Sequence, residues 1–146
     1  MNEIIIKRPI SDEDFEHYFL LRWETLRKPW NEPEGSEQDD MENNCCHRMA
    51  VINNRIVGVA RLQLNSEQEG QIRYMGVDAQ SRGRGIGRKL VETLEHEARA
   101  KGVNHIILHA RENAVAFYII LGYSVIEESY VLFNEIQHYL MRKDLI

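Results

Sequence analysis

A basic, glycine-rich stretch at residues 80–90, QSRGRGIGRKL, constrains this chain more than any other feature. Glycine occupies every second position from Gly83 to Gly87, after an apolar, strand-like segment at residues 72–77 and before an amphipathic helical pattern. Glycine lets a ligand approach the backbone closely. The first N–H groups of a helix lack intrahelical partners and lie at the positive end of its dipole. The stretch therefore predicts a strand, a turn and a helix whose start suits a diphosphate.

Alternative glycine-rich motifs fit this stretch poorly. A dinucleotide fingerprint requires Gly or Ala where this chain has Arg88, and an acid after the next strand, where residues 109–111 read HAR. The P-loop pattern is absent. The spacing Arg82-x-x-Gly85-x-Gly87 resembles an element of the GNAT N-acetyltransferases, and an ordinary solvated turn before a helix is the alternative.

A second stretch, NAVAFYIILGY at residues 113–123, resembles the segment that follows strand five in the same superfamily. The spacing of Ala114, Phe117 and Leu121 predicts that Phe117 is a core aromatic of a short helix. Tyr118 lies off that apolar stripe. The resemblance therefore implies a catalytic role for Tyr118.

Composition limits the class of protein. A length of 146 residues, with 43% hydrophobic and 28% charged residues, predicts one domain spanning residues 1–146. The net charge of −5 argues against general affinity for nucleic acid or an anionic membrane, and no apolar run is long enough to span a bilayer. Cys45 and Cys46 are adjacent, so we expect neither a disulfide nor a zinc site, and we expect a cytoplasmic protein without a metal.

Periodicity predicts an α+β fold with a mixed sheet. We expect strands at residues 1–9, 47–52, 55–64, 71–77, 103–110, 124–133 and 136–143, and helices at residues 12–27, after the glycine-rich turn and near residues 113–121. Ser11 and Asp14 predict a capping box, and Gly102 a helix end. The resemblance implies a GNAT-type, mostly antiparallel twisted sheet with helices on both faces, splayed between strands 4 and 5.

Residues 28–44 break every periodicity, and six acids follow Pro29 there without a base. We expect a mobile, solvated loop. The functional alternative is a loop that borders the acceptor pocket and attracts a cationic amine. Arg61, in the expected strand at residues 55–64, either faces solvent or points into the cleft.

Several short segments resemble the ElaA-like branch of the GNAT proteins. They are LRW at residues 21–23, LRKPW at 26–30, RYMGV at 73–77, ARENA at 110–114 and the pair His138 and Met141. This narrower resemblance implies that Trp23, Arg73 and His138 are pocket residues.

The GNAT resemblance implies a transfer of an acetyl group from acetyl-CoA to a primary amine of a small molecule or peptide, by direct attack in a ternary complex. The diphosphate of acetyl-CoA would lie on the amides of residues 82–88, and its pantetheine arm would lie on the strand at residues 75–77. The cofactor-binding residues implied are Met75, Gly76, Val77, Arg82, Gly83, Arg84, Gly85, Ile86, Gly87, Arg88, Asn113, Ala116 and Phe117.

The catalytic groups implied are Tyr118, as general acid to the leaving thiolate, and His138, as general base. The corresponding stretch of strand 4, QIRY at residues 71–74, has no carboxylate to act as a base. His138 is otherwise an ordinary surface histidine, and His109 and Glu112 are weaker candidates. Tyr74 either lines the substrate pocket or packs across strands.

A non-catalytic acyl-CoA-binding sensor is the alternative function, because it shares the diphosphate turn but needs neither Tyr118 nor a base. The acceptor is not defined, although the acidic loop favours a polyamine, an aminoglycoside-like or a lysine-bearing substrate. The resemblance also implies a possible homodimer through the terminal strands.

Overall fold

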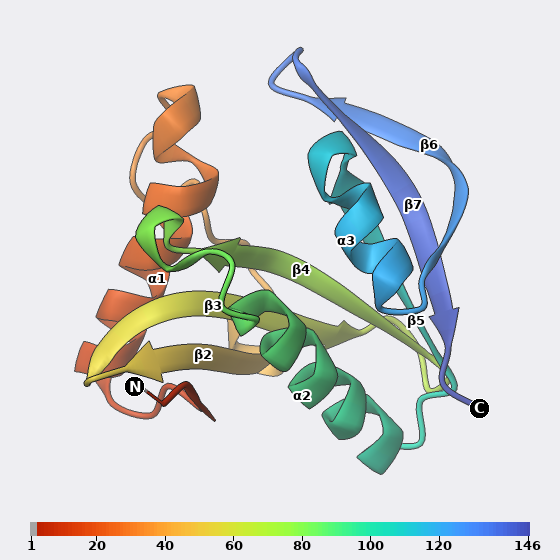
Figure 1. The fold of residues 1–146 in the computed structure, drawn as a ribbon, viewed down its shortest axis with the longest axis horizontal. Helices are drawn as coiled ribbons and strands as arrows, with labels where there is room; N and C mark the ends of the chain where they lie inside the picture. The colour runs from red at the N-terminus through yellow and green to blue at the C-terminus, as the bar shows by residue number, and fades with distance from the viewer. Residues whose placement is uncertain (1–2) are drawn as a thin grey trace.

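The computed structural model describes residues 3–146 (Figure 1). In chain order its elements are β1 (Ile5–Lys7), α1 (Asp12–Leu26), η1 (Lys28–Trp30), η2 (Glu42–Asn44), β2 (Cys46–Ile52), β3 (Arg55–Leu64), β4 (Glu69–Val77), η3 (Ala79–Ser81), α2 (Ile86–Ala100), β5 (His105–Arg111), η4 (Glu112–Ala114), α3 (Val115–Ile120), β6 (Ser124–Leu132) and β7 (Ile136–Asp144). The η elements are single 3-10 turns. Strands and α-helices follow one another in the predicted order.

The strands form one sheet in the order β1-β2-β3-β4-β5-β7-β6. All neighbouring strands are antiparallel except β4 and β5, which are parallel and joined through α2. The predicted α+β class and the mixed, mostly antiparallel sheet are therefore confirmed.

Most ends of the helices and strands lie within two residues of the positions predicted from the sequence. The first strand was predicted over residues 1–9 and is observed at Ile5–Lys7, while residues 1 and 2 lie outside the described part of the chain. The predicted capping box forms, since Ser11 Oγ accepts from the N–H of Asp14 and the Asp14 carboxylate accepts from the N–H of Ser11. Gly102, at φ +82°, follows the last turn of α2.

Helices cover both faces of the sheet, as predicted. Side chains alternate along β2, so Met49 and Val51 face the smaller cluster under α1, whereas Ala50 and Ile52 belong to the larger core under α2. Figure 1 shows α2 in front of the sheet and α1 behind it. None of the helices within residues 3–146 is long and apolar enough to cross a membrane.

The parallel pair β4–β5 is joined at one end only. Its register runs from Glu69↔His105 to Gln71↔Ile107, and the strands then separate. In β4 a bulge lies just beyond this point, where Tyr74 and Met75 stand opposite Ala60 alone. Tyr74 there adopts φ +55°, a left-handed conformation that strains a bulky residue. The predicted splay is confirmed, and it leaves residues 72–77 with an edge that β5 does not pair.

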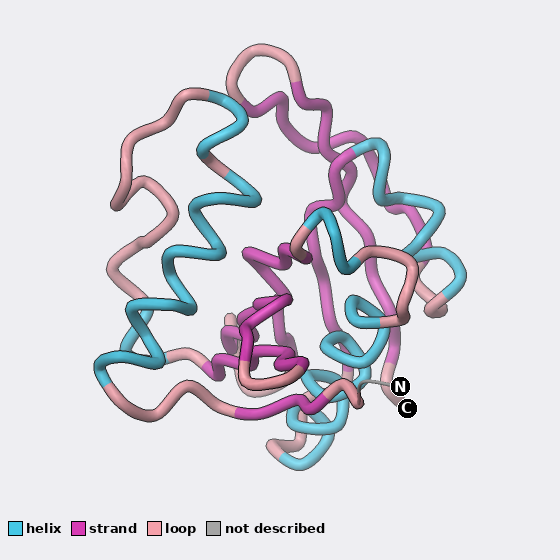
Figure 2. Tube along the Cα trace, turned by 60° about the vertical axis from the view of Figure 1, so that its left-hand side comes forward, coloured by secondary structure: helices cyan, strands magenta, loops and turns pink. Residues whose placement is uncertain are grey.

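Residues 28–44 were expected to form a solvated loop, but several of their backbone groups are bound by side chains of the helix before them. Figure 2 shows this segment running back alongside α1. Trp23 Nε1 donates to Glu32 O at 2.9 Å, and the buried Arg22 donates to Glu37 O at 3.1 Å. Helix α1 therefore anchors the segment by side-chain donors that local sequence patterns do not reveal.

Candidate active site

The splay between β4 and β5 opens a cleft of about 320 Å³. Its walls come from the last turn of α1, from both separated strands, from α3 and from the β6–β7 hairpin. Of the predicted site residues, the following line it: Arg73, Tyr74, Met75, Gly76, Val77, Arg82, Asn113, Tyr118 and His138.

The turn at residues 82–88 has the geometry of an anion cradle at the start of α2. Gly83 and Gly85 adopt φ +82° and φ +79°, and a Cβ at either position would meet no other atom within 4 Å. These glycines therefore serve the backbone conformation and leave the N–H groups open to a ligand, rather than making room for a neighbouring side chain. Gly87 differs, because its Cβ would lie 3.1 Å from Phe117 Cζ. The turn thus fits a diphosphate through its main chain.

At two of the residues predicted to bind the cofactor, packing within the protein decides the residue type. Ile86 is buried in the core, so only its backbone can contact a ligand. Gly76 lies under α1, and a Cβ there would collide with Thr25 Oγ1. Close packing of α1 therefore explains the glycine, while the neighbouring Met75 and Val77 line the cleft.

Tyr118 is the buried residue of α3, with 7% of its surface exposed, whereas Phe117 is only half-buried. Phe117 packs against the main core as predicted, but Tyr118 is the more deeply buried of the two, so its predicted position off the core stripe is wrong. The chain enters α3 through the 3-10 turn η4, which rotates the helix relative to an ideal α-helical stripe. Tyr118 nevertheless lines the cleft, and its Oη has no hydrogen-bond partner within residues 3–146. Burial raises the pKa of Tyr118, so the phenol keeps its proton.

His138 on β7 is 4% exposed and is not the surface histidine of the alternative interpretation. Its ring stacks on Tyr130 with centroids 4.4 Å apart, and its Nδ1 lies 3.0 Å from Ile136 O. A carbonyl can only accept, so Nδ1 carries the hydrogen and Nε2 holds the lone pair of the neutral ring. Burial lowers the pKa of His138, and the charges of Arg111, His109 and Arg27 add to this. The ring is therefore neutral at pH 7 and able to accept a proton.

His109 on β5 lies in the same wall, with a ring centroid 5.3 Å from that of Tyr130. Its Nδ1 is buried and has no partner among the described residues. Burial, followed by the charge of Arg73, lowers the pKa of His109. Two neutral imidazoles thus face one part of the cleft.

Guanidinium groups surround the strained Tyr74. The Cζ atoms of Arg22, Arg73, Arg61 and Arg27 lie 4.5, 4.7, 4.8 and 5.7 Å from its ring centroid. Cation–π contacts stabilise by about 0.5–1 kcal/mol each at exposed sites and by about 2 kcal/mol or more where water is excluded. These contacts offset the backbone strain. The sequence left open whether Tyr74 lines the pocket or packs against neighbouring residues, and the structure shows that it does both.

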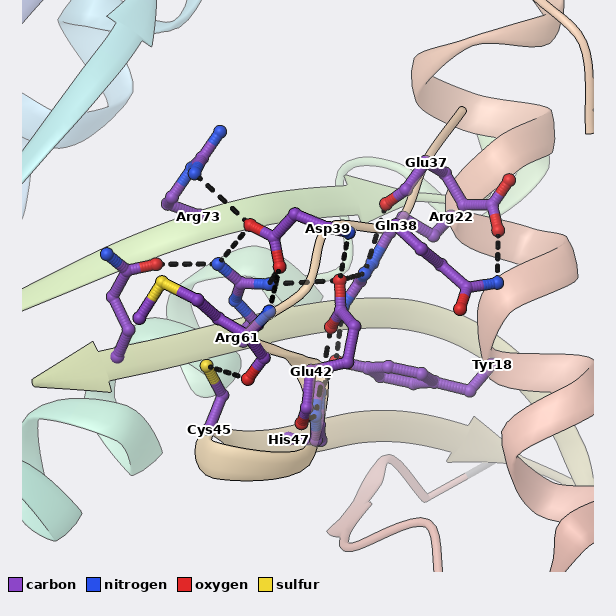
Figure 3. Close-up of polar contacts among 12 residues, drawn as sticks. Tyr18, Arg22, Glu37, Gln38, Asp39, Glu42, Cys45, His47, Arg61 and Arg73 are labelled. Atoms are coloured by element: carbon purple, nitrogen blue, oxygen red, sulfur yellow. Dashed lines mark hydrogen bonds and ion pairs between the residues drawn. The ribbon is translucent and has the colours of Figure 1, made fainter. Parts of the chain in front are cut away.

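The acids of residues 28–44 pair with three of these arginines (Figure 3). Asp39 pairs with Arg61 and, at 3.4 Å, with Arg73, while Glu42 pairs with Arg22 and Arg61 at 2.9 Å. Arg61 is fully buried, so it neither faces solvent nor lies free in the cleft. Asp39 and Glu42 are therefore committed to arginines, and these two acids are not free to form the acidic rim of the functional alternative.

The structure does not bring every predicted residue to the cleft. Trp23 packs against residues 28–44 and is not part of the cleft wall, and Ala116 is exposed outside it. Arg84 and Arg88 are exposed on the glycine-rich turn, where Arg88 pairs with Glu92 at 3.3 Å. Sequence reasoning missed Arg27, Arg111 and Tyr130 as wall residues. They come from three distant elements, so no local pattern joins them.

The sheet is splayed at its parallel pair, and a glycine-rich helix start lies at the mouth of the gap, which is the arrangement that the GNAT resemblance implied. Residues 15–123 match the Acetyltransferase (GNAT) family. An uncharacterized N-acetyltransferase, YjcF of Bacillus subtilis, is 31% identical over 99% of this chain and 100% of its own length. The chain belongs to the GNAT acetyltransferase family.

Solved structures share this fold at low sequence identity. A putative N-acetyltransferase from Lactobacillus plantarum superposes with a TM-score of 0.86 at 21% identity, covering 99% of this chain and 100% of its own. An aminoglycoside 6'-N-acetyltransferase complexed with coenzyme A gives 0.81 at 19% identity, covering 97% of each chain. Escherichia coli ElaA gives 0.79 at 21% identity, covering 98% of this chain and 99% of its own.

Proposed function

We propose that residues 1–146 form one acetyl-CoA-dependent N-acetyltransferase domain, which transfers the acetyl group to a primary amine by direct attack in a ternary complex. The carrying observation is the unpaired edge of β4, which runs between the open glycine-rich turn and the wall that holds Tyr118. Membership of the GNAT family and the coenzyme A in the aminoglycoside acetyltransferase structure support this assignment.

Acetyl-CoA binds in this proposal by main-chain contacts. The diphosphate accepts hydrogen bonds from N–H groups of residues 83–88, and Arg82 adds a charge at the cleft wall. The amides of the pantetheine arm pair with the free edge of β4 at Met75–Val77, as an added strand would. Asn113, exposed at the cleft wall, contacts the same arm in this proposal.

The reaction needs a neutral amine, and a neutral imidazole can accept the proton that the amine loses. The amine nitrogen attacks the thioester carbon, the C–S bond breaks, and sulfur leaves with the electron pair. A strand N–H of β4 stabilises the oxyanion that develops on the carbonyl. His138, neutral because burial lowers its pKa, takes the proton that the nitrogen loses.

Tyr118 acts on the departing sulfur. A thiol is more acidic than an ordinary tyrosine, and burial raises the pKa of Tyr118 further. Complete transfer of the tyrosine proton to a thiolate is therefore uphill. Tyr118 acts chiefly as a hydrogen-bond donor whose contact strengthens as charge builds on sulfur, and the proton from the amine finally neutralises the thiolate.

The test is release of free thiol from acetyl-CoA with purified protein and a panel of primary amines. Amine-dependent thiol release, with acetylated product seen by mass spectrometry, would support the proposal. Saturable binding of acetyl-CoA without thiol release for any acceptor would favour the sensor. Assignment to the ElaA-like branch is part of the proposal, supported by the quoted segments and by the ElaA fold.

A further inference from the structure

The charges in the cleft wall show a consistent sign. Its charged side chains are Arg27, Arg73, Arg82 and Arg111, and no Asp or Glu of residues 3–146 lines it. The whole chain carries a net charge of −5, so this concentration of positive charge opposes the overall balance.

Arg27 and Arg111 are held together without a counter-ion. Arg27 Nη1 and Arg111 Nη2 both donate to Leu26 O, at 3.2 and 3.3 Å, so the two guanidinium groups are neighbours. Neither forms an ion pair with any residue in the described range 3–146. Burial, followed by the charge of Arg27, lowers the pKa of Arg111, which is the response of a cation lacking an anion.

Arg73 completes the group. Its guanidinium and that of Arg27 both contact the Tyr74 ring. Its one carboxylate partner, Asp39, lies 3.4 Å away and is engaged more closely by Arg61, at 2.8 Å. Burial raises the pKa of Tyr130, whereas the charges of Arg73, Arg27 and Arg111 lower it. All three guanidinium groups therefore lie near this wall.

The diphosphate of acetyl-CoA does not supply the missing anion. Arg27 follows the last turn of α1, Arg111 contacts the carbonyl of Leu26 in that turn, and Arg73 contacts Asp39 beside α1. The glycine-rich turn begins α2, which covers the opposite face of the sheet. A second, anionic molecule entering on the α1 side is needed to neutralise these arginines.

We propose that the acceptor is a primary amine that also carries a carboxylate or phosphate group, which Arg27, Arg73 and Arg111 bind while the amine reaches the thioester. This inference rests on the proposed function and names the substrate class of the same site. The three cations also disfavour an ammonium ion nearby, which helps to present the amine in its neutral, nucleophilic form.

Matched acceptors test the proposal with the full chain. Three pairs differ chiefly in the anionic group: β-alanine and 3-aminopropan-1-ol, 4-aminobutyrate and 4-aminobutan-1-ol, and O-phosphoethanolamine and ethanolamine. We expect kcat/KM for thiol release to be at least about tenfold higher for the anionic member, the usual effect of one charge-assisted hydrogen bond. 1,4-Diaminobutane should be the poorest acceptor. Equal rates within the pairs, or a preference for the diamine, would overturn the proposal.

Substitutions at Arg111 test whether this residue recognises the anionic group of the acceptor. Arg111→Gln should raise KM for the anionic acceptor about tenfold or more and should lower kcat/KM much more for the anionic acceptor than for the neutral one, with KM for acetyl-CoA unchanged. Arg111→Lys should restore part of the loss. Arg142→Gln, at a half-exposed arginine paired with Asp144 outside the cleft, is the matched control and should behave as wild type. An equal loss for both members of a pair would refute charge recognition at Arg111.

Calorimetry separates this inference from the proposed function. If no amine releases thiol, the transferase assignment fails, and O-phosphoethanolamine is then titrated into the CoA-saturated protein. Saturable heat that is lost in Arg111→Gln and kept in Arg142→Gln would sustain an anionic ligand at this wall. Absence of saturable heat, or binding that ignores Arg111→Gln, would overturn it.

Discussion

Asp39 and Arg61 form a two-pronged ion pair, with Oδ1 2.8 Å from Nη1 and Oδ2 3.0 Å from Nη2. Arg61 is fully buried on β3, and Asp39 comes from the irregular segment that returns along α1. The pair therefore ties residues 28–44 to the sheet directly beneath the cleft. It also explains why an acidic segment borders a cleft whose own charges are positive.

Asp39→Asn should destabilise the protein. The change weakens the contacts to a buried guanidinium, but Glu42 remains 2.9 Å from Arg61, so we expect a loss of about 1–3 kcal/mol. Asp40→Asn removes the same charge from an exposed neighbour and should change stability little. Urea denaturation of the three proteins measures the difference, and equal midpoints for the two variants would contradict the buried pair.

The stability difference between wild type and Asp39→Asn should depend on pH in a defined direction. Hydrogen bonding to Arg61 lowers the pKa of Asp39 to about 2, from an ordinary value of 3.8. A lowered folded-state pKa gives stability that is complete above the unfolded value and is lost as the pH falls through the folded one. The difference should stay constant from pH 7 to pH 5 and shrink below pH 3.8.

Tyr118→Phe should lower kcat for thiol release while leaving KM for acetyl-CoA nearly unchanged. The phenol donates a hydrogen bond that strengthens as charge builds on sulfur, so the expected loss is about 10²–10³-fold. Tyr139→Phe removes a hydroxyl outside the cleft wall and is the control. Circular dichroism checks the fold, and an unchanged kcat in a folded Tyr118→Phe protein would remove Tyr118 from the mechanism.

Gly85→Ala should weaken binding of CoA about tenfold or more, since a diphosphate gripped by main-chain N–H groups does not tolerate a side chain between them. Gly35→Ala is a matched control, because Gly35 at φ +101° is equally open, and a methyl group added there would meet nothing within 4 Å. Both substitutions should lose about 1–2 kcal/mol of stability from left-handed strain. Calorimetric titration with CoA should separate them, and equal affinities would place the diphosphate elsewhere.

The pKa of His138 should rise when Arg111 is neutralised. A nearby cation disfavours the imidazolium, and burial, Arg111, His109 and Arg27 all lower the pKa of His138 below 6.5. Removing one cation therefore moves the pKa upward, toward its ordinary value. NMR titration of the ring in wild type and Arg111→Gln measures the shift, with Arg142→Gln as control. A downward shift or none would separate Arg111 from His138.

Local sequence determined the elements and the turn. Periodicity located the strands and α2, Ser11 and Asp14 formed the expected capping box, and Gly83 and Gly85 adopted the left-handed conformation that their spacing favours. These features depend on interactions between residues about four positions apart or fewer, so short segments of the sequence are enough to predict them. The split between β4 and β5 followed from the family resemblance rather than from any single pattern.

Tertiary structure alone decided the electrostatics. Residues 28–44 read as a solvated acidic loop, yet their acids pair with Arg22, Arg61 and Arg73 from α1, β3 and β4. Likewise Arg27 and Arg111 meet at one carbonyl although they lie far apart in the chain. Coulombic energy depends on distance and on exclusion of water, and both are set by how the elements pack. The sequence could therefore identify a cleft for acetyl-CoA, whereas the sign of charge offered to its partner emerged only from the fold.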